Sequence, residues 1–415
     1  MRDLDPGRED AFFALFKDYF DLERDAGKQH DSANYGIERL FPLAELAGNP
    51  ERKLKIIHVA GTKGKGSTCY FIAALLNAAG RRCGCFSSPH LDTVRERFQL
   101  DGRLAGYSEL EAVAQPLCRK LRMAGLHPSL FEIFTVLALK LFADAGMEYA
   151  VLETGIGGTL DATNYVDGKS LTVITALSYD HTALLGNTMR EIAAQKAGIL
   201  RPAVPVVLAP QPFAEAEQEV RLAAHSIGAP VVSPVPAAEC PEWLPAGSAP
   251  YLRENFRTAF TALRQLGIVP ERKAFAVPQL RARFERICEN PLVIIDAAHN
   301  GDSARRLTQA VQSCYPGLHF LCVLGCVPGK DVTRIAEQLS AMDAEFILTD
   351  PDTPRGSALP QLVAAAAAAG LRVRAVIPHL DSSAVLPADM PLLFTGSFFT
   401  ALIGEKLFGS AGTAG

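Results

Sequence analysis

"HVAGTKGKGSTCYF", residues 58–71, places three glycines and two lysines between an apolar run and a stretch with helical patterning. The glycines allow backbone N–H groups to converge on an anion, and the positive end of the following helix points to the same place. Lys65 has the length and charge to reach the terminal phosphates of a nucleotide. We therefore predict a phosphate-binding loop for a nucleoside triphosphate, in which Ser67 or Thr68 supplies the hydroxyl group that faces Mg²⁺.

The alternative for this segment is a glycine-rich turn between strand and helix with solvated lysines. The loop departs from the general phosphate-loop pattern at two positions, because Val59 stands where a first glycine is expected and Gly66 stands where Ser or Thr follows the Gly-Lys pair. The strand expected before the loop and the helix expected after it still favour phosphate binding, since such loops require this context.

Apolar runs recur along the chain at the spacing of α/β proteins, and each of the first eight is followed by an amphipathic stretch suited to a helix. Short continuous apolar strands that alternate with helices indicate parallel sheets covered on both faces. In such sheets, ligands bind beyond the carboxyl ends of the strands. The expected strands lie at 55–61, 83–89, 149–155, 171–177, 204–210, 292–298, 320–325, 345–350 and 391–396.

The composition limits the class of protein. The 415 residues, of which 48% are hydrophobic and 21% charged, are enough for two or three domains with buried cores. The net charge of −4 gives no strong field for nucleic acid or an anionic membrane, so we expect a small-molecule partner. Nine cysteines without a Cys-x-x-Cys pair suit free thiols in a reducing cytosol. Because the N-terminus is charged and no apolar run reaches about 18 residues, we expect a soluble, cytoplasmic protein that is not exported.

Two breaks in the pattern suggest domain limits. Residues 229–250 are rich in Pro and Ala with little periodicity, and we interpret them as an irregular connection. A helical segment follows at 253–267, and residues 278–291 bring a second, polar break before a new series of strands, which we take as the boundary. The predicted organisation is a nucleotide-binding domain at 1–280, a linker at 281–290 and a C-terminal domain at 291–415.

Charged and polar residues follow several of the expected strands. Glu153 ends the strand at 149–155, where a carboxylate beside a phosphate loop holds Mg²⁺ or positions a water molecule. Asp180 and His181 stand at the end of the next strand. The alternative for Glu153 is a helix cap or turn carboxylate, and a lone histidine is more often structural than a ligand. Such groups at adjacent strand ends, downstream of a phosphate loop, favour a shared metal site.

Two further segments are ambiguous on residue chemistry alone. Lys196 lies in an expected helix next to apolar positions, so it either snorkels to solvent or has a special role, and its chemistry favours snorkelling. Asp296 ends a strand, and His299 and Asn300 stand in the turn before an expected helix. A helix N-cap by Asn300 or Asp302 is the plain alternative there, and it can coexist with ligand contact.

Taken together, these segments resemble the folylpolyglutamate synthase/dihydrofolate synthase family of the Mur ligase superfamily, whose members form amide bonds at the expense of ATP. The matching segments occur in the family's order between residues 35 and 400, and the ordered set is highly specific although no one segment is decisive. The segments are "GTKGKGS", "SSPHL", "RERF", "LETGIGGTLDATN", "DHTALLGNT", "IAAQKAGI", "RARFE", "DAAHN", "GKD" and "GSFFT".

The resemblance implies an α/β fold with an N-terminal phosphate-loop ATPase domain of Mur ligase type and a smaller, Rossmann-like C-terminal α/β domain, with the active site in the cleft. The ATP contacts that it implies are Thr62, Lys63, Gly64, Lys65, Gly66, Ser67, Asn255, Arg283 and Asp296. The implied Mg²⁺ ligands are Ser67, Ser88, Glu153, His181 and Lys196, and Lys196 matches a lysine that is carbamylated in this family and serves a second Mg²⁺. The implied substrate contacts are Asp161, His299 and Ser397. The implied catalytic residues are Lys65, Lys196, Asp296 and His299.

The chemistry that the resemblance implies is acyl activation. The carboxylate of dihydropteroate, or the γ-carboxylate of a folate glutamate tail, attacks the γ-phosphorus of ATP, and the amine of L-glutamate then displaces phosphate from the acyl phosphate. Lysine, backbone amides and two Mg²⁺ ions suit the negative charge that builds up in these steps. The expected partners are ATP, L-glutamate and either acceptor, with no nucleic acid and no membrane, and the expected state is a monomer.

Three residues depart from the family pattern. Lys63 replaces the usual Asn, Thr159 the usual Arg and Gln195 the usual Glu. Lys63 adds a positive charge beside the triphosphate, which we expect to be tolerated. Thr159 stands in a loop expected near the pterin pocket, so we expect the choice of acceptor to be sensitive to that position.

Two other functions are the alternatives. A related Mur-type ligase that acts on another carboxylate, such as a cell-wall enzyme, shares the ATP chemistry. However, only 57 residues precede His58, which we expect to be too few for the additional uridine-nucleotide domain of the cell-wall enzymes. A nucleotide-dependent switch protein would use the phosphate loop without acyl transfer, and the second α/β domain has no task in that case.

Overall fold

In the computed structural model, the described residues are 5–20, 36–351, 356–380, 386–387 and 389–409. The chain divides into two compact units, of which the first comprises Met1–Trp243 and Glu254–Pro278 and the second comprises Leu244–Arg253 and Gln279–Gly415. Residues 244–253, predicted to lie in the first domain, therefore belong with the second unit. The reason is packing, because Ala249 and Leu252 join the apolar core of the second unit.

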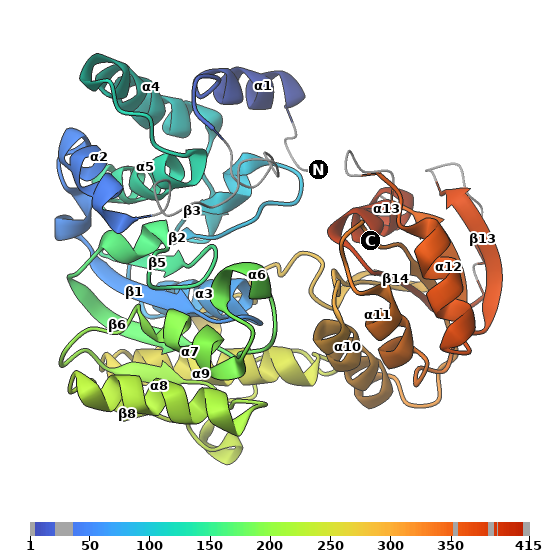
Figure 1. The fold of residues 1–415 in the computed structure, drawn as a ribbon. Coiled ribbons are helices and arrows are strands. Elements are labelled where there is room, and N and C mark those ends of the chain that lie inside the picture. The colour runs from blue at the N-terminus through green and yellow to red at the C-terminus, as the bar shows by residue number, and fades with distance from the viewer. Residues whose placement is uncertain (1–4, 21–35, 352–355, 381–385, 388, 410–415) are drawn as a thin grey trace. The chain divides into compact units, whose positions relative to one another are not determined.

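The first unit is built on an eight-stranded sheet (Figure 1). Six neighbouring strands run parallel in the order β2-β5-β1-β6-β7-β8, and β3 and β4 extend the β2 edge in antiparallel fashion. Because β1 lies in the middle, the carboxyl ends of β2, β5, β1 and β6 meet at one edge, where ligands bind in such sheets. The strands are β1 (Lys55–Ala60), β2 (Cys83–Phe86), β3 (Phe98–Leu100), β4 (Arg103–Leu104), β5 (Tyr149–Glu153), β6 (Lys169–Ile174), β7 (Val206–Leu208) and β8 (Val231–Val232).

Helices cover both faces of this sheet. Helices α1 (Pro6–Ala14), α2 (Leu40–Ala47), α4 (Tyr107–Ala124) and α5 (Leu130–Asp144) lie together in Figure 1 and share one apolar core with residues of β1, β2 and β5. Helices α3 (Lys65–Ala78) and α9 (Pro250–Gln265) pack against each other through Phe71 and Phe256, whose ring centroids are 5.5 Å apart. Helices α7 (Met189–Ala197) and α8 (Ala214–Ser226) share a third cluster with β6 and β7. The short helices are α6 (Thr182–Leu185), η1 (Ile37–Arg39), η2 (Pro50–Lys53), η3 (Val94–Arg97), η4 (Ala162–Tyr165), η5 (Ala237–Glu239) and η6 (Arg272–Ala274).

The second unit is a smaller α/β layer structure. Its sheet has the order β13-β12-β11-β14-β10-β9, in which only β9 is antiparallel to its neighbour among the described strands. Helices α10, α11 and α12 pack on the face that carries Ile294 and Leu393, whereas α13 packs on Ile295 and Phe394. Successive strand residues point to opposite faces, so both faces are covered. The elements are β9 (Glu285–Glu289), β10 (Leu292–Ile295), β11 (Phe320–Leu324), β12 (Ala344–Asp350), β13 (Val373–His379), β14 (Leu392–Thr395), α10 (Gly301–Cys314), α11 (Val332–Leu339), α12 (Leu359–Ala368) and α13 (Phe398–Phe408).

The predicted α/β class is confirmed, and all nine expected strands are present in parallel ladders. The strands that the sequence did not predict are the short or edge strands β3, β4, β8, β9 and β13. Two of them correct specific expectations, because β8 lies inside the segment interpreted as irregular and the predicted linker at 281–290 contains β9. Edge strands bury little apolar surface and carry polar residues or Pro, so they lack the continuous apolar run used for prediction.

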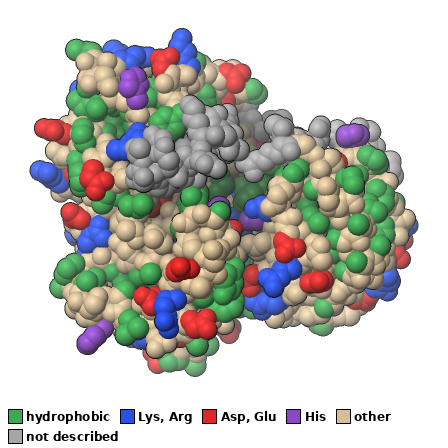
Figure 2. Space-filling view, in the orientation of Figure 1, with side chains coloured by type: hydrophobic (Ala, Val, Ile, Leu, Met, Phe, Trp, Pro, Cys, Tyr) green, Lys and Arg blue, Asp and Glu red, His purple; other side chains and the backbone are tan. Residues whose placement is uncertain are grey.

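The surface and the thiols agree with the composition. On the face shown in Figure 2, positive and negative side chains of the described residues are interspersed over each unit. All nine cysteines are free thiols, and most of them are buried. Among the helices that the structure describes, none combines the length and the apolar character needed to cross a membrane.

Candidate active site

The predicted phosphate loop joins β1 to α3 in four residues. Gly61 has φ +152°, and Gly64 has φ +84° and occupies the N-cap position of α3. The N–H groups of Thr62 and Lys63 donate to the carbonyl of Ala176, at 3.1 and 2.9 Å. These two hydrogen bonds fix the loop to the segment that follows β6.

Close packing requires glycine at both positions. A Cβ atom at Gly61 would lie 1.9 Å from Oγ1 of Thr175, and one at Gly64 would lie 2.4 Å from Oδ1 of Asn255. Asn255, a predicted ATP contact, thus lies directly against the loop. Because Gly64 has no side chain to cap α3, the first N–H groups of this 14-residue helix are available to an anion.

Glu153 lies over the first turn of α3. Its side chain is 5% exposed, and its Oε2 accepts the N–H of Ser88 at 3.2 Å. A Cβ atom at Gly66 would lie 3.2 Å from the same oxygen. The carboxyl ends of β2 and β5 and the phosphate loop thus meet at one carboxylate. Ser67, which is 4% exposed, stands in the same helical turn.

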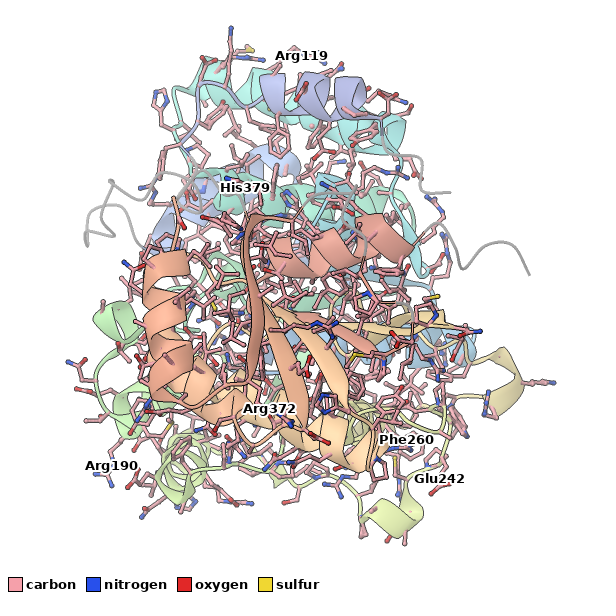
Figure 3. All side chains as sticks on the ribbon, turned by 90° about the vertical axis from the view of Figure 1, so that its right-hand side faces the viewer. Arg119, Arg190, Glu242, Phe260, Arg372 and His379 are labelled. Carbon is pink, nitrogen blue, oxygen red and sulfur yellow. The ribbon has the colours of Figure 1, made fainter. Side chains whose placement is uncertain are left out.

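Lys196 is buried within α7, and the snorkelling expectation was wrong. Its side chain is 3% exposed and its Nζ donates to the carbonyl of Gly157 at 3.4 Å. The loop before η4 packs against the backbone at the end of α7. A Cβ atom at Gly158 in this loop would lie only 2.5 Å from the carbonyl oxygen of Gln195. In contrast, Arg190 on the same helix extends away from the molecule (Figure 3) and pairs with Glu219 at 3.6 Å.

The surroundings of Lys196 change its protonation. Burial, together with the positive charge of Lys65, lowers the pKa of Lys196 to about 7, although the negative charges of Asp161 and Asp180 oppose the shift. The carboxylates and the two lysines therefore lie close enough to interact electrostatically. A lysine with this pKa has an appreciable neutral fraction near pH 7, so its amine is able to act as a nucleophile.

Asp161 is a second buried charge in this region. It is 4% exposed, its Oδ2 accepts the N–H of Ile156 at 2.9 Å, and its Oδ1 accepts the N–H of Thr163 at 3.0 Å. Burial raises the pKa of the Asp161 carboxyl, while the hydrogen bonds from Thr163 and the charge of Lys196 oppose this shift. The carboxylate thereby closes the loop that covers Lys196.

Asp180 and His181 were expected to stand at the end of a strand, and this expectation was wrong. β6 ends at Ile174, and the two residues follow after a further loop. Asp180 pairs with Lys63 of the phosphate loop at 3.4 Å, which brings it to the predicted site. His181 has φ +49° at the N-cap of α6, and its side chain is 47% exposed.

The predicted metal ligands do not form a closed metal cage. In the part of the chain that the structure describes, no group of three or more His, Cys, Asp or Glu side chains is placed to hold a metal ion. Mg²⁺ in nucleotide sites keeps several water molecules and is bound by one or two protein ligands and by phosphate oxygens. Glu153 and the hydroxyl-bearing first turn of α3 fit that kind of ion, which arrives with the nucleotide.

The predicted residues of the second unit gather beyond β10 and β14. The Asp296 carboxylate accepts the hydroxyl of Tyr251 at 2.9 Å and the N–H groups of Phe284 and Ala298 at 2.8 and 2.9 Å. Burial raises the pKa of Asp296, and the positive charge of Arg283 opposes the shift. Asp296 is thus a buried, firmly held carboxylate.

An aromatic ring holds the other predicted residues of this unit together. The guanidinium of Arg283 lies 4.8 Å from the ring centroid of Phe398, and the His299 ring lies 6.2 Å from it. Ser397 precedes Phe398 and caps α13 by accepting the N–H of Thr400 at 3.0 Å. The plain alternative for Asn300 is also confirmed, because its Oδ1 accepts the N–H of Ser303 at 3.0 Å as an N-cap.

Several buried polar residues around the site were missed by the sequence analysis. Lys169, at the start of β6, is 6% exposed and donates to Oδ1 of Asn164 at 2.7 Å and to the carbonyl of Ile199 at 2.8 Å. Asn164 in turn donates to the carbonyls of Thr159 and Gly198, so this network ties the loop before η4 to the end of α7. Burial lowers the pKa of Lys169 to about 6. A lysine at the start of a strand is ordinarily solvated, so the sequence carried no indication of this network.

Comparison with known proteins gives consistent results. Residues 282–387 match the family described as Mur ligase, glutamate ligase domain. The chain is 31% identical over 359 residues to the dihydrofolate synthase/folylpolyglutamate synthase of Bacillus subtilis (strain 168). This alignment covers 78% of this chain and 82% of that protein. The structure of E. coli FolC in complex with DHPP and ADP matches with a TM-score of 0.80 and 28% identity, over 95% of each chain. The enzyme from Yersinia pestis, a bifunctional folylpolyglutamate synthase/dihydrofolate synthase complexed with AMPPNP and Mn ion, matches with a TM-score of 0.76 and 29% identity, over 90% of this chain and 94% of that chain.

We predict that Gly61→Ala abolishes nucleotide binding. The new Cβ atom would clash with Thr175, so the loop has to leave the position that its bonds to Ala176 define. We expect the Kd for ADP, measured by isothermal titration calorimetry, to rise by more than about tenfold, because the loop's backbone donors would no longer converge. Gly125→Ala is the matched control, since Gly125 also has a positive φ but no atom within 4 Å of its Cβ position. An ADP affinity of Gly61→Ala equal to that of the control would contradict the assignment of this loop.

Proposed function

Because the chain belongs to the dihydrofolate synthase/folylpolyglutamate synthase family, we propose that its first unit activates a folate carboxylate with ATP and that its second unit serves the incoming glutamate. The protein is an ATP-dependent ligase that adds L-glutamate to a folate. The observation that carries the residue roles below is the meeting of the phosphate loop, Glu153, Asp180 and the buried Lys196 beside the carboxyl ends of parallel strands.

The phosphate loop is proposed to hold the triphosphate. The N–H groups of the α3 N-terminus and the ammonium of Lys65 bind phosphoryl oxygens, and Asn255 supports the turn from behind. A bound Mg²⁺ ion would be held by the phosphates together with Glu153 and Ser67, and it would supply charge neutralisation. The proposed ATP contacts of the loop are Thr62, Lys63, Gly64, Lys65, Gly66 and Ser67.

Acyl transfer then needs two steps with balanced chemistry. An acceptor carboxylate oxygen bonds to the γ-phosphorus while the bond to ADP breaks, which gives an acyl phosphate. The neutral amine of L-glutamate next attacks the acyl carbon, phosphate leaves, and the amine loses a proton as the amide forms. Both steps place negative charge on oxygen, which the fixed N–H groups and lysines of the loop stabilise without reorganising.

Lys196 is proposed to be carbamylated and to serve a second divalent ion. The ammonium first loses a proton, and the neutral amine then attacks CO₂, so that a C–N bond forms and a second proton is released; a cation thereby becomes an anion. Burial supports this, because an ordinary lysine with a pKa of about 10.4 has roughly one neutral amine in a few thousand at pH 7, whereas burial lowers the pKa of Lys196 to about 7. Ser88 and His181 are the remaining proposed metal ligands.

The second unit is proposed to contribute Arg283 and Asp296 to the nucleotide and His299 and Ser397 to glutamate. The ring of Phe398 holds the guanidinium of Arg283 flat, which suits a planar donor for phosphate or carboxylate. Asp296 is held in place by three hydrogen bonds within the second unit. We also propose that the protein acts as a monomer in the cytoplasm, where its nine thiols stay reduced.

ADP formation by the purified protein tests the function. We expect repeated turnover to ADP only when ATP, Mg²⁺, L-glutamate and a folate acceptor are all present, because the acceptor is needed to form the acyl phosphate and the amine is needed to consume it. Parallel reactions with dihydropteroate and with tetrahydrofolate identify the acceptor. ADP formation that is independent of both folate and glutamate would instead identify a nucleotide switch.

For Lys196→Ala, we expect synthesis to be abolished while the Kd for ADP changes by no more than about twofold. In the wild type, incubation with ¹³C-bicarbonate should give a carbamate resonance in the ¹³C NMR spectrum, and Lys196→Arg should lack it because arginine does not form a carbamate. Arg190→Ala on the same helix is the control for a general effect on α7. Unchanged turnover of Lys196→Ala would exclude the carbamate.

Thr159 tests which acceptor the loop selects. Its hydroxyl donates to the carbonyl of Gln195 at 3.1 Å, and its position is exposed, two residues before Asp161. We expect Thr159→Arg to change the ratio of kcat/KM for dihydropteroate and tetrahydrofolate by several-fold, since a long cation enters the loop. Thr159→Ala removes the same hydrogen bond without adding charge and should leave that ratio unchanged. An unaltered ratio in Thr159→Arg would remove this position from the acceptor site.

A further inference from the structure

A buried histidine stands in β1, three residues before the phosphate loop. His58 is 0% exposed, and its Nε2 lies 2.7 Å from Oγ1 of Thr163. Its Nδ1 is also buried and has no hydrogen-bond partner in the described part of the chain. Burying an imidazole with one nitrogen unpaired is costly, so a purely space-filling role would be served better by an apolar residue.

The hydrogen bonds around Thr163 define which nitrogen carries the proton. Oγ1 of Thr163 also lies 2.5 Å from Oδ1 of Asp161, and an ionised carboxylate only accepts. The single hydroxyl proton therefore goes to Asp161, and Thr163 has to accept from His58. This requires the tautomer with a proton on Nε2, which leaves the buried Nδ1 as the bare nitrogen.

The chain of hydrogen bonds continues to the site. Asp161 accepts the N–H of Ile156, and the next residue, Gly157, accepts Nζ of Lys196. A Cβ atom at Gly155 would lie 3.3 Å from Oδ2 of Asp161 and 2.8 Å from the Phe131 ring, so the loop has little room to adopt another path. A chain of hydrogen bonds thus runs from β1 to the loop that covers Lys196.

We propose that His58 is a positioning residue that acts through Thr163 on Asp161 and thereby orders the loop at 155–161 for the acceptor. The proposal rests on the proposed function, in which Asp161 contacts the acceptor. His58 touches neither the nucleotide loop's donors nor a reacting atom. Its loss therefore affects acceptor use and leaves nucleotide binding intact.

A pair of amide substitutions separates hydrogen bonding from packing. The side-chain amide of Gln reaches the position of Nε2 of histidine, whereas that of Asn reaches the position of Nδ1. We expect His58→Asn to lower kcat/KM for the folate acceptor by about tenfold or more, because Thr163 loses its donor. His58→Gln should retain most of the activity. In both variants the Kd for ADP should stay within about twofold of the wild-type value.

Substitutions at Thr163 test the same bond from its other end. Thr163→Val removes the hydroxyl and should reduce kcat/KM for the acceptor as His58→Asn does, whereas Thr163→Ser should preserve it. The double variant His58→Asn/Thr163→Val should have a kcat/KM no lower than that of the less active single variant, because both changes break the same chain of hydrogen bonds. This pair keeps the proposal testable if substitutions at His58 prevent folding.

Three results of these substitutions would overturn the proposal. They are equal activity of His58→Gln and His58→Asn, additive losses in the double variant, and a loss of ADP affinity that parallels the loss of synthesis. ¹⁵N NMR of the wild-type histidine side chains gives a test that is independent of the reaction. It should show a neutral His58 with the proton on Nε2, and a proton on Nδ1 would overturn the proposal. A protein that shows this tautomer but forms no ADP with folate and glutamate would contradict the proposed function alone.

Discussion

The turn between β1 and α3 is the constraint on which the rest of the site depends. Four residues join the strand to the helix and leave the first N–H groups of α3 without a side-chain cap, and this path is possible only because Gly61 and Gly64 let Thr175 and Asn255 approach. The carbonyl of Ala176 then fixes the turn from the neighbouring strand. The proposed phosphate site thus depends on two adjacent parallel strand ends and not on one loop, and the same edge brings Glu153 and Asp180 to the loop.

Burial of charge is the second feature that shapes the chemistry. Lys196, Asp161 and Lys169 are each less than 7% exposed, and burial shifts each pKa toward the neutral form. Removing water from around these groups strengthens their mutual interactions, and in the proposed mechanism it would also protect an acyl phosphate from hydrolysis. The positive charge of Lys65 lowers the pKa of Lys196, so a bound triphosphate, which cancels that charge, would oppose this effect.

The sequence predicted those parts of the fold and site that depend on continuous apolar runs and on local turns. All nine central strands, the strand–turn–helix geometry of the predicted phosphate loop and the Asn300 cap could be predicted, because a few neighbouring residues determine each of them. The burial of Lys196 could not, since the loop that covers it comes from a segment some forty residues earlier in the chain. The same holds for the bond from Lys169 to Ile199 and for the bond from Tyr251 to Asp296, because each joins residues that are distant in sequence. Edge strands were missed because exposed strands lack an apolar run.

Strand β1 links the two halves of the first unit's chemistry. Its last residue leads into the phosphate loop. His58, two positions before that last residue, forms a hydrogen bond with Thr163 on the side of Asp161 and Lys196. In the proposed mechanism, the distance from the phosphate loop to the loop at 155–161 is therefore set along one short strand, which is hydrogen-bonded to β5 on one side and to β6 on the other. Attack on a phosphorus atom requires reacting atoms to be held within a fraction of an ångström. A central strand, which is among the most rigid elements of a sheet protein, is a suitable place from which to impose that distance.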